Sequence, residues 1–249
     1  MNFLPDYSKR VYGLDIFRAI AILLVVQGHG GFMLKGTPFE NFPWIRLIDG
    51  VDLFFVLSGF LIGSILLKMV QESNFVLSWK QVLHFWKRRW FRTLPNYYLI
   101  LIVNIVFVST GIIKGRMDQF SYKFFLFIQN FSDPFYGFFW ESWSLTIEEW
   151  FYILLPVLLV LILKLFPSKK GILFALALMI VFPLVYRIIN APQKMNAFWW
   201  DVTFRKVVLM RLDTIIYGVL AAYIKFYHKQ FFQKIAVSSF FFGIAIILA

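Results

Sequence analysis

Three ionisable side chains interrupt one apolar stretch, GLDIFRAIAILLVVQGHG, near the start of the chain: Asp15, Arg18 and His29. Arg18 and His29 are 11 positions apart, so in an α-helix they share a face to within about 20° and lie about 16 Å apart. Asp15 precedes Arg18 by one turn and can pair with it. Charged groups in membrane helices usually face the bundle interior or a water-filled path. The alternative is a helix-end ion pair and a histidine at the membrane interface.

Acids begin two later apolar stretches. Asp52 lies near the start of GVDLFFVLSGFLIG, and Glu148 and Glu149 lie in ESWSLTIEEWFY. Asp52 has an alternative role, since a carboxylate near a helix N-terminus stabilises the helix dipole. Ser144 precedes the two glutamates at a spacing close to a capping box, so we expect one of them to be structural.

A further apolar stretch carries RLD, with Arg211 and Asp213, which are candidate substrate-binding residues. The alternative is pairing of these two side chains with other helices. Tyr152, one turn after Glu148, is expected to be a core or interfacial residue.

The residue types define a chemistry. A histidine titrates near neutral pH, so with a neighbouring carboxylate it can remove a proton from a hydroxyl group. The run KRRWFR supplies Arg88, Arg89 and Arg92, and guanidinium groups bind phosphates such as those of an acyl donor. The alternative for this cluster is an ordinary loop whose positive charge sets membrane topology.

Composition defines the setting for this chemistry. Of the 249 residues, 60% are hydrophobic and only 15% are charged, which indicates a polytopic membrane protein. The net charge of +12 is explained by membrane topology and anionic lipids, so we expect membrane lipids as partners and no nucleic acid. The chain has no cysteine, which excludes a protein thiol as carrier of an acyl group.

The hydrophobic pattern predicts an all-α transmembrane helix bundle. Its seven segments are residues 13–33, 50–70, 94–113, 144–165, 171–190, 207–226 and 235–249. Residues 78–95 interleave bases with aromatics, which predicts an interfacial amphipathic helix. The aromatic segment 120–139 is expected to lie at the interface or dip into the membrane without spanning it.

Basic residues set the expected orientation. More Lys and Arg fall on the side that holds Lys9 and Arg10, so we expect a cytoplasmic N-terminus and a retained first helix. His29, Asp52, Glu148 and Asp213 then converge at one level in the outer half of the membrane. Because Ala249 falls within an apolar run, we expect the natural protein to continue past it.

Five motifs, in order, resemble the membrane acyltransferase 3 family. They are the first stretch with Arg18 and His29, then GVDLFFVLSGFLIG, RRWFRTLPNYY, WSLTIEEWFYILLP and RLDTIIYG. The resemblance spans nearly the whole chain, so residues 1–249 are expected to form one transmembrane acyltransferase domain. The family domain has about ten helices, so the seven segments here are expected to be part of it.

The resemblance implies an inner-membrane O-acyltransferase. Such proteins move an acyl group, usually acetyl, from cytoplasmic acyl-CoA to a hydroxyl of lipopolysaccharide, another polysaccharide, peptidoglycan or a lipid-linked glycan. His29 is then the essential histidine with Arg18 as its motif partner, and Glu148 and Asp52 are the motif acids. Arg88, Arg89 and Arg92 correspond to the motif that meets the donor. Acyl-CoA is a co-substrate, and no bound cofactor or metal is expected.

Two other functions fit parts of the pattern. Histidine and carboxylates within a membrane also build proton relays, so a proton-coupled transporter is an alternative. Transporters often contain inverted repeats, and we find none in this sequence. A non-catalytic membrane subunit is the third hypothesis. Transfer of label from acetyl-CoA to a surface glycan separates the enzyme from both.

Overall fold

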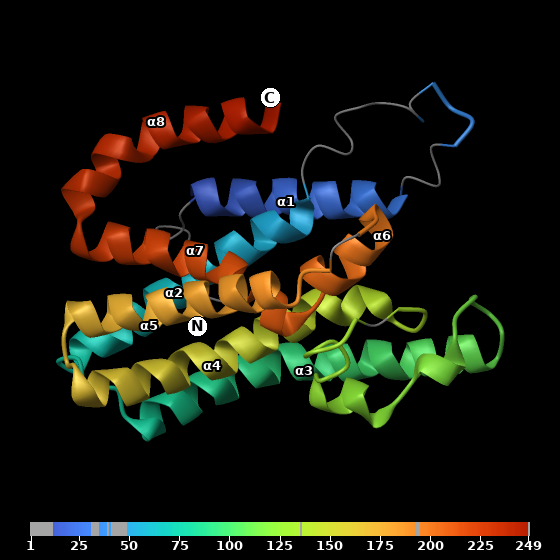
Figure 1. Cartoon of the computed structure of the whole chain (residues 1–249), viewed down its shortest axis with the longest axis horizontal. Coiled ribbons are helices and arrows are strands. Elements are labelled where there is room, and N and C mark those ends of the chain that lie inside the picture. Colours follow the sequence, from blue (N-terminus) through green and yellow to red (C-terminus); the bar gives the residue numbers. More distant parts are fainter. Residues whose placement is uncertain are drawn as a thin grey trace, which may run out of the picture. The chain divides into compact units, whose positions relative to one another are not determined.

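The computed structural model describes residues 12–30, 35–38, 40, 49–134, 136–192 and 195–248 (Figure 1). Its regular secondary structure is helical throughout these residues, which confirms the all-α class. The main helices are α1 (Tyr12–Gly30), α2 (Gly50–Glu72), α3 (Trp79–Ser109), α4 (Trp143–Leu165), α5 (Lys169–Ile189), α6 (Ala197–Trp200), α7 (Val208–Tyr227) and α8 (Lys229–Leu248).

Several helices are long and apolar enough to cross a membrane. Within the described residues these are five, α1 to α5, or up to six if α6 and the π-helix η7 (Asp201–Arg205) form one span with α7 across a 69° bend. This confirms a multi-pass membrane protein. The last predicted segment is confirmed as a helix, α8. Residues 31–33 of the first segment, and the topology residues Lys9 and Arg10, lie outside the described part of the chain.

The chain divides into two compact units, Met1–Gly63 with Gly218–Ala249, and Ser64–Tyr217. In the first unit, helices pack closely through glycine. A Cβ at Gly63 would lie 2.9 Å from Val219 Cα, and one at Gly218 would lie 2.0 Å from Val56 O. Small residues allow membrane helices to approach each other closely, so these two glycines hold α2 against α7.

In the second unit, α3 corrects one prediction. Residues 78–95 do not form a separate interfacial helix, because α3 continues through Pro95 to Ser109. A reciprocal capping box between Ser78 and Gln81 starts the helix. Pro95 removes one backbone hydrogen bond, but buried Tyr97 and Leu101 pack the following turns against the rest of the unit.

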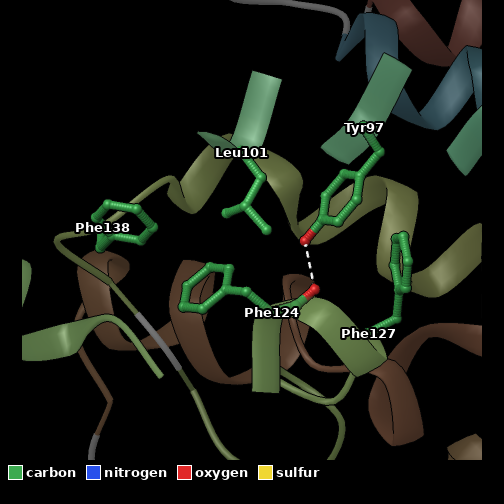
Figure 2. Close-up of a cluster of buried hydrophobic side chains, with 5 residues drawn as sticks. All are labelled: Tyr97, Leu101, Phe124, Phe127 and Phe138. Carbon is green, nitrogen blue, oxygen red and sulfur yellow. Dashed lines mark hydrogen bonds between the residues drawn. The ribbon is translucent and has the colours of Figure 1, made fainter. Parts of the chain in front are cut away.

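The segment between α3 and α4 is confirmed not to be a span. It contains the short 3₁₀ helices η4 (Met117–Gln119), η5 (Tyr122–Leu126) and η6 (Trp140–Ser142). Figure 2 shows its aromatic side chains packed on α3, where the Tyr97 hydroxyl donates a 2.9 Å hydrogen bond to Phe124 O. Trp150 Nε1 donates to Phe127 O at 2.6 Å. Side chains of neighbouring helices thus bind the carbonyl groups that this irregular backbone leaves unpaired.

The other long helices of this unit form a hairpin. Helices α4 and α5 pack side by side and are joined by a tight turn in which a Cβ at Gly171 would lie 2.1 Å from Phe166 O. Ser168 caps α5 by accepting a hydrogen bond from Gly171 N. Helices α3 and α4 carry Arg88, Arg89, Arg92 and Glu148 of the predicted site.

Candidate functional site

Helix α1 satisfies its polar side chains within itself. Arg18 Nη1 lies 2.8 Å from Asp15 Oδ1, and the two side chains are about two-fifths exposed. His29 Nδ1 lies 2.8 Å from Val25 O, one turn earlier in the helix. The predicted pairing of Asp15 with Arg18 is therefore confirmed. A local ion pair lowers the cost of placing two charges in an apolar helix.

The contact of His29 assigns the roles of its ring nitrogens. A carbonyl oxygen only accepts hydrogen bonds, so Nδ1 carries the proton that Val25 O accepts. In the neutral imidazole, Nε2 then has the lone pair. The side chain of His29 is exposed, so this nitrogen can reach a ligand.

The start of α2 lies against α1. Asp49 Oδ1 accepts a 2.9 Å hydrogen bond from Val51 N, as an N-cap residue does. A Cβ on Gly50 would lie 2.6 Å from Ala21 O of α1, so the backbones touch there. Asp52 follows in the first turn of α2. The structure therefore places Asp52 and His29 on two helices in contact.

In the second unit, Tyr152 connects Arg89, a predicted donor-binding residue, to Glu148, a predicted catalytic acid. Its hydroxyl accepts a 2.6 Å hydrogen bond from Arg89 Nη2 and donates a 3.0 Å hydrogen bond to Glu148 Oε2. The Arg89 guanidinium also lies 4.5 Å from the centre of the Tyr152 ring. Tyr152 is buried, as expected, but the sequence did not predict that it connects these two residues. The four-residue spacing between Glu148 and Tyr152 indicated the contact between these two side chains, but no sequence signal indicated the contact with Arg89.

Glu149 is a buried acid, and the capping arrangement predicted between Ser144 and one of the two glutamates does not form. Helix α4 begins at Trp143, and Ser142, in the N-cap position, forms no side-chain capping bond. Helical hydrogen bonding already begins in η6, where Ser142 N donates to Phe139 O, so Ser144 lies inside a continuous helical segment. Ser144 is therefore not a cap. Glu149 is 2% exposed, and its carboxylate oxygens form no hydrogen bond within the described chain.

The arginines of α3 separate into two groups. Arg89 faces α4 through its contacts with Tyr152. Arg88 and Arg92, one turn apart, are both exposed and form no ion pair or hydrogen bond with the described residues. Their shared face can accept phosphate groups, which makes these two arginines the stronger candidates for a donor site.

Asp213 pairs with a residue that sequence reasoning did not select. Arg187 of α5 donates to both carboxylate oxygens, at 3.0 and 2.6 Å, and also to Met210 O. Asp213 is buried, and Arg211 beside it is half-buried. The Arg187–Asp213 pair fastens α5 to α7. Nothing in the spacing of the two residues, 26 apart, indicated this contact.

The site predicted from the sequence falls in both units. Asp15, Arg18, His29 and Asp52 belong to the first unit, and Arg88, Arg89, Arg92, Glu148, Arg211 and Asp213 to the second. Their convergence at one level of the membrane stays a prediction. Among the described residues, no group of three or more His, Cys, Asp and Glu side chains is arranged to hold a metal ion.

The long apolar helices define the class of this protein as a multi-pass helical membrane protein. Comparison with known proteins identifies the family of this chain. The model of a family described as "Acyltransferase domain" matches residues 11–249, so the chain belongs to this family. The predicted acyltransferase 3 resemblance and the enzyme class are thereby confirmed.

Curated relatives carry similar names. The chain is 34% identical over 180 residues to the peptidoglycan O-acetyltransferase OatA of Listeria monocytogenes, which covers 66% of this chain and 26% of that protein. It is 31% identical over 243 residues to a putative O-acetyltransferase of Staphylococcus aureus strain COL, covering 88% and 36%. It is 30% identical to the O-acetyltransferase OatA of Staphylococcus aureus strain NCTC 8325, covering 96% and 39%. The chain thus spans about two-fifths or less of the relatives' length. No solved structure matches it.

Proposed function

We propose that this chain is a membrane O-acetyltransferase domain. It moves an acetyl group from cytoplasmic acetyl-CoA to a hydroxyl of a cell-surface or lipid-linked glycan, at the plasma (inner) membrane. Family membership and the names of the relatives support this proposal. The observation that carries it is the hydrogen bond from His29 to Val25 O, because it leaves Nε2 as the base.

The proposed reaction follows from that assignment. His29 Nε2 removes the proton of the acceptor hydroxyl while the oxygen attacks the thioester carbonyl carbon. The tetrahedral intermediate collapses, the carbon–sulfur bond breaks, and the imidazolium returns its proton to the CoA thiolate. Products are the acetyl ester and CoA. Asp52 lies in the first turn of α2, the helix whose start contacts α1, and we assign it as the acid that accompanies His29.

Donor binding is assigned to α3. Arg88 and Arg92 are exposed on one face, and CoA carries phosphate groups that guanidinium groups bind with charge-assisted hydrogen bonds. Arg89, Tyr152 and Glu148 hold α3 against α4 behind that face.

Labelled acetyl-CoA tests the proposal. Membranes containing the chain, fused to the remaining length of its natural protein where there is one, should incorporate radioactive acetyl groups into isolated cell-envelope glycan. Membranes without the chain provide the baseline. Proton flux without incorporation of label would support the transporter instead. Absence of both proton flux and label would support a non-catalytic subunit.

Orientation requires its own experiment. Cysteines introduced at Lys87 and at Lys35 should react with an impermeant maleimide from opposite sides of the membrane, because the proposed topology puts Lys87 in the cytoplasm. The chain has no native cysteine, so the background is low. Reaction of both positions from one side would refute the proposed topology.

A further inference from the structure

A cavity of about 370 Å³ opens beside the C-terminal end of α3. Its walls come from α3, from the residues between α3 and α4, and from Phe198 of α6. All of these belong to the second unit. None of the residues predicted to act in catalysis or donor binding lines it, so the cavity is a separate feature.

Aromatic rings form much of the wall. Tyr136, Phe139, Trp140 and Phe198 all line the cavity. Tyr136 and Phe198 meet edge to face, with ring centres 6.0 Å apart. Trp140 is 41% and Phe198 49% exposed, so part of each ring is accessible to a ligand. Lys206 Nζ lies 4.4 Å from the centre of the Trp140 ring and occupies one of its faces. Rings gathered from two segments into one concavity differ from an interfacial belt, in which aromatic side chains face lipid singly.

Three polar side chains share the cavity: Asn104, Lys114 and Glu141. The Asn104 amide nitrogen donates to Ile100 O at 2.9 Å, so its side-chain oxygen points to no partner within the described chain. Lys114 forms no ion pair with the described residues. Glu141 accepts one hydrogen bond from Trp140 Nε1 at 2.6 Å, which uses one of its two oxygens.

The backbone around the cavity is held in place. Gly137 has φ +95°, a conformation that other residues rarely adopt, and a Cβ there would lie 3.1 Å from Arg116 Cδ. Arg116 N donates to Gly137 O at 2.9 Å. Phe139 has φ +40°, which is strained for a bulky residue, and such strain concentrates at binding and catalytic sites.

Arg116 itself is occupied. Its guanidinium lies 2.6 Å from Asp118, and this hydrogen-bonded pairing lowers the pKa of the Asp118 carboxyl and raises the pKa of Arg116. The two charges neutralise each other at neutral pH. Lys114 is therefore the cation that the cavity offers to a ligand.

We propose that this cavity binds a sugar unit of the acceptor glycan. A pyranose ring has apolar C–H faces that pack on aromatic rings, and hydroxyl groups around its edge that bond to amide, carboxylate and ammonium groups. The cavity supplies both kinds of contact, and its volume lies in the range of small-ligand sites. Lys114 favours an acidic sugar, because an ammonium group attracts a carboxylate.

The position of the cavity suits an acceptor. Asn104 lies 15 residues after Arg89 in α3, which is about 22 Å along a continuous helix. The arginines and the cavity therefore lie toward opposite ends of one membrane-length helix. Calling the bound sugar the acceptor rests on the proposed function. The binding of a sugar to the cavity can be measured without any acetyl transfer.

The test is glycan binding to the full chain in phosphatidylcholine nanodiscs without acetyl-CoA. The probe is soluble glycan released from peptidoglycan by a muramidase, followed by saturation-transfer NMR and titration. Trp140→Ala should raise the dissociation constant about tenfold or more, and Lys114→Gln should raise it severalfold. Trp140→Phe keeps a ring and should stay close to wild type.

Matched controls lie at the other end of α3. Trp79→Ala and Lys80→Gln alter an exposed tryptophan and an exposed lysine that do not line the cavity, and they should leave binding unchanged. If Trp140→Ala lowers the thermal midpoint, Glu141→Gln, an exposed change, replaces it and should also weaken binding.

Each result decides between alternatives. Absence of glycan binding in the wild type, or equal losses in cavity and control variants, would overturn the inference. Loss of binding on changing the nanodiscs to phosphatidylglycerol would assign the cavity to a lipid headgroup and would also overturn it. Binding that depends on Trp140 in a chain that transfers no acetyl group would support the inference and refute only the proposed function.

Discussion

Helix α1 and the α3–α4 interface handle polar groups in opposite ways. In α1, the contacts of Arg18 and His29 are with residues of the same helix, and Ala21 is its buried residue. At the α3–α4 interface, Arg89 donates a hydrogen bond to the buried hydroxyl of Tyr152, a residue 63 positions later in the sequence. Polar groups that face outward can meet a ligand, whereas those tied between helices hold the helices in position. Under the proposed function, α1 supplies the catalytic base and the α3–α4 interface holds the helices in position.

The Arg187–Asp213 pair is a second contact that holds helices in position, and its loss should have the largest effect on stability. Asp213→Ala leaves the mostly buried Arg187 guanidinium without its carboxylate, and breaking such a pair costs about 3–5 kcal/mol. The thermal midpoint in detergent should fall strongly. The double variant Arg187→Met with Asp213→Ala should recover part of the loss, because no charge is left unpaired. A normal midpoint with weakened substrate binding would instead return Asp213 to the substrate site.

Loss of one hydroxyl at the α3–α4 interface should have a smaller effect. Tyr152→Phe keeps the ring under Arg89 but removes both hydrogen bonds of the hydroxyl. Hydrogen bonds to charged groups contribute about 1.5–3 kcal/mol, so unfolding should occur at lower denaturant concentration. Tyr217→Phe, which removes the hydroxyl of an exposed tyrosine, is the matched control. Equal midpoints for the two variants would show that the link between Arg89 and Glu148 is not structural.

The exposed arginines should affect binding and leave stability unchanged. Replacing Arg88 and Arg92 with Gln should raise the KM for acetyl-CoA about tenfold or more, since each charge-assisted phosphate contact is worth about 1.5 kcal/mol. The thermal midpoint should stay at its wild-type value. Arg89→Gln should do the reverse, with a lower midpoint and a smaller change in KM. Unchanged donor dependence in the Arg88 and Arg92 variant would leave those residues with a topological role only.

The same contrast explains what could be predicted from sequence. Helix positions and the Asp15–Arg18 pair follow from periodicity and one-turn spacing, which depend on neighbouring residues. Pairs such as Arg187 with Asp213 depend on how two helices pack together. Partners on different helices have no fixed separation in the sequence, so no local pattern predicts them.

Two local interpretations were wrong for the same physical reason. We predicted a separate interfacial helix over residues 78–95 and a capping arrangement at Ser144, but tertiary contacts override both local signals. Packing of Tyr97 and Leu101 continues α3 beyond Pro95, and η6 supplies the start of α4 without a side-chain cap. Local propensity is a weak guide wherever packing can offset a lost hydrogen bond.

The central claim is that α1 carries the chemistry through His29. The most direct test measures both the acetyl-transfer rate and the thermal midpoint of His29→Ala, expressed at wild-type levels in the same membranes. A positioned general base is worth about 10²–10⁴-fold, so the rate should fall by about two orders of magnitude or more while the midpoint stays unchanged. His29→Gln should not restore the rate. Wild-type transfer by His29→Ala would contradict the claim and leave His29 as an interfacial residue.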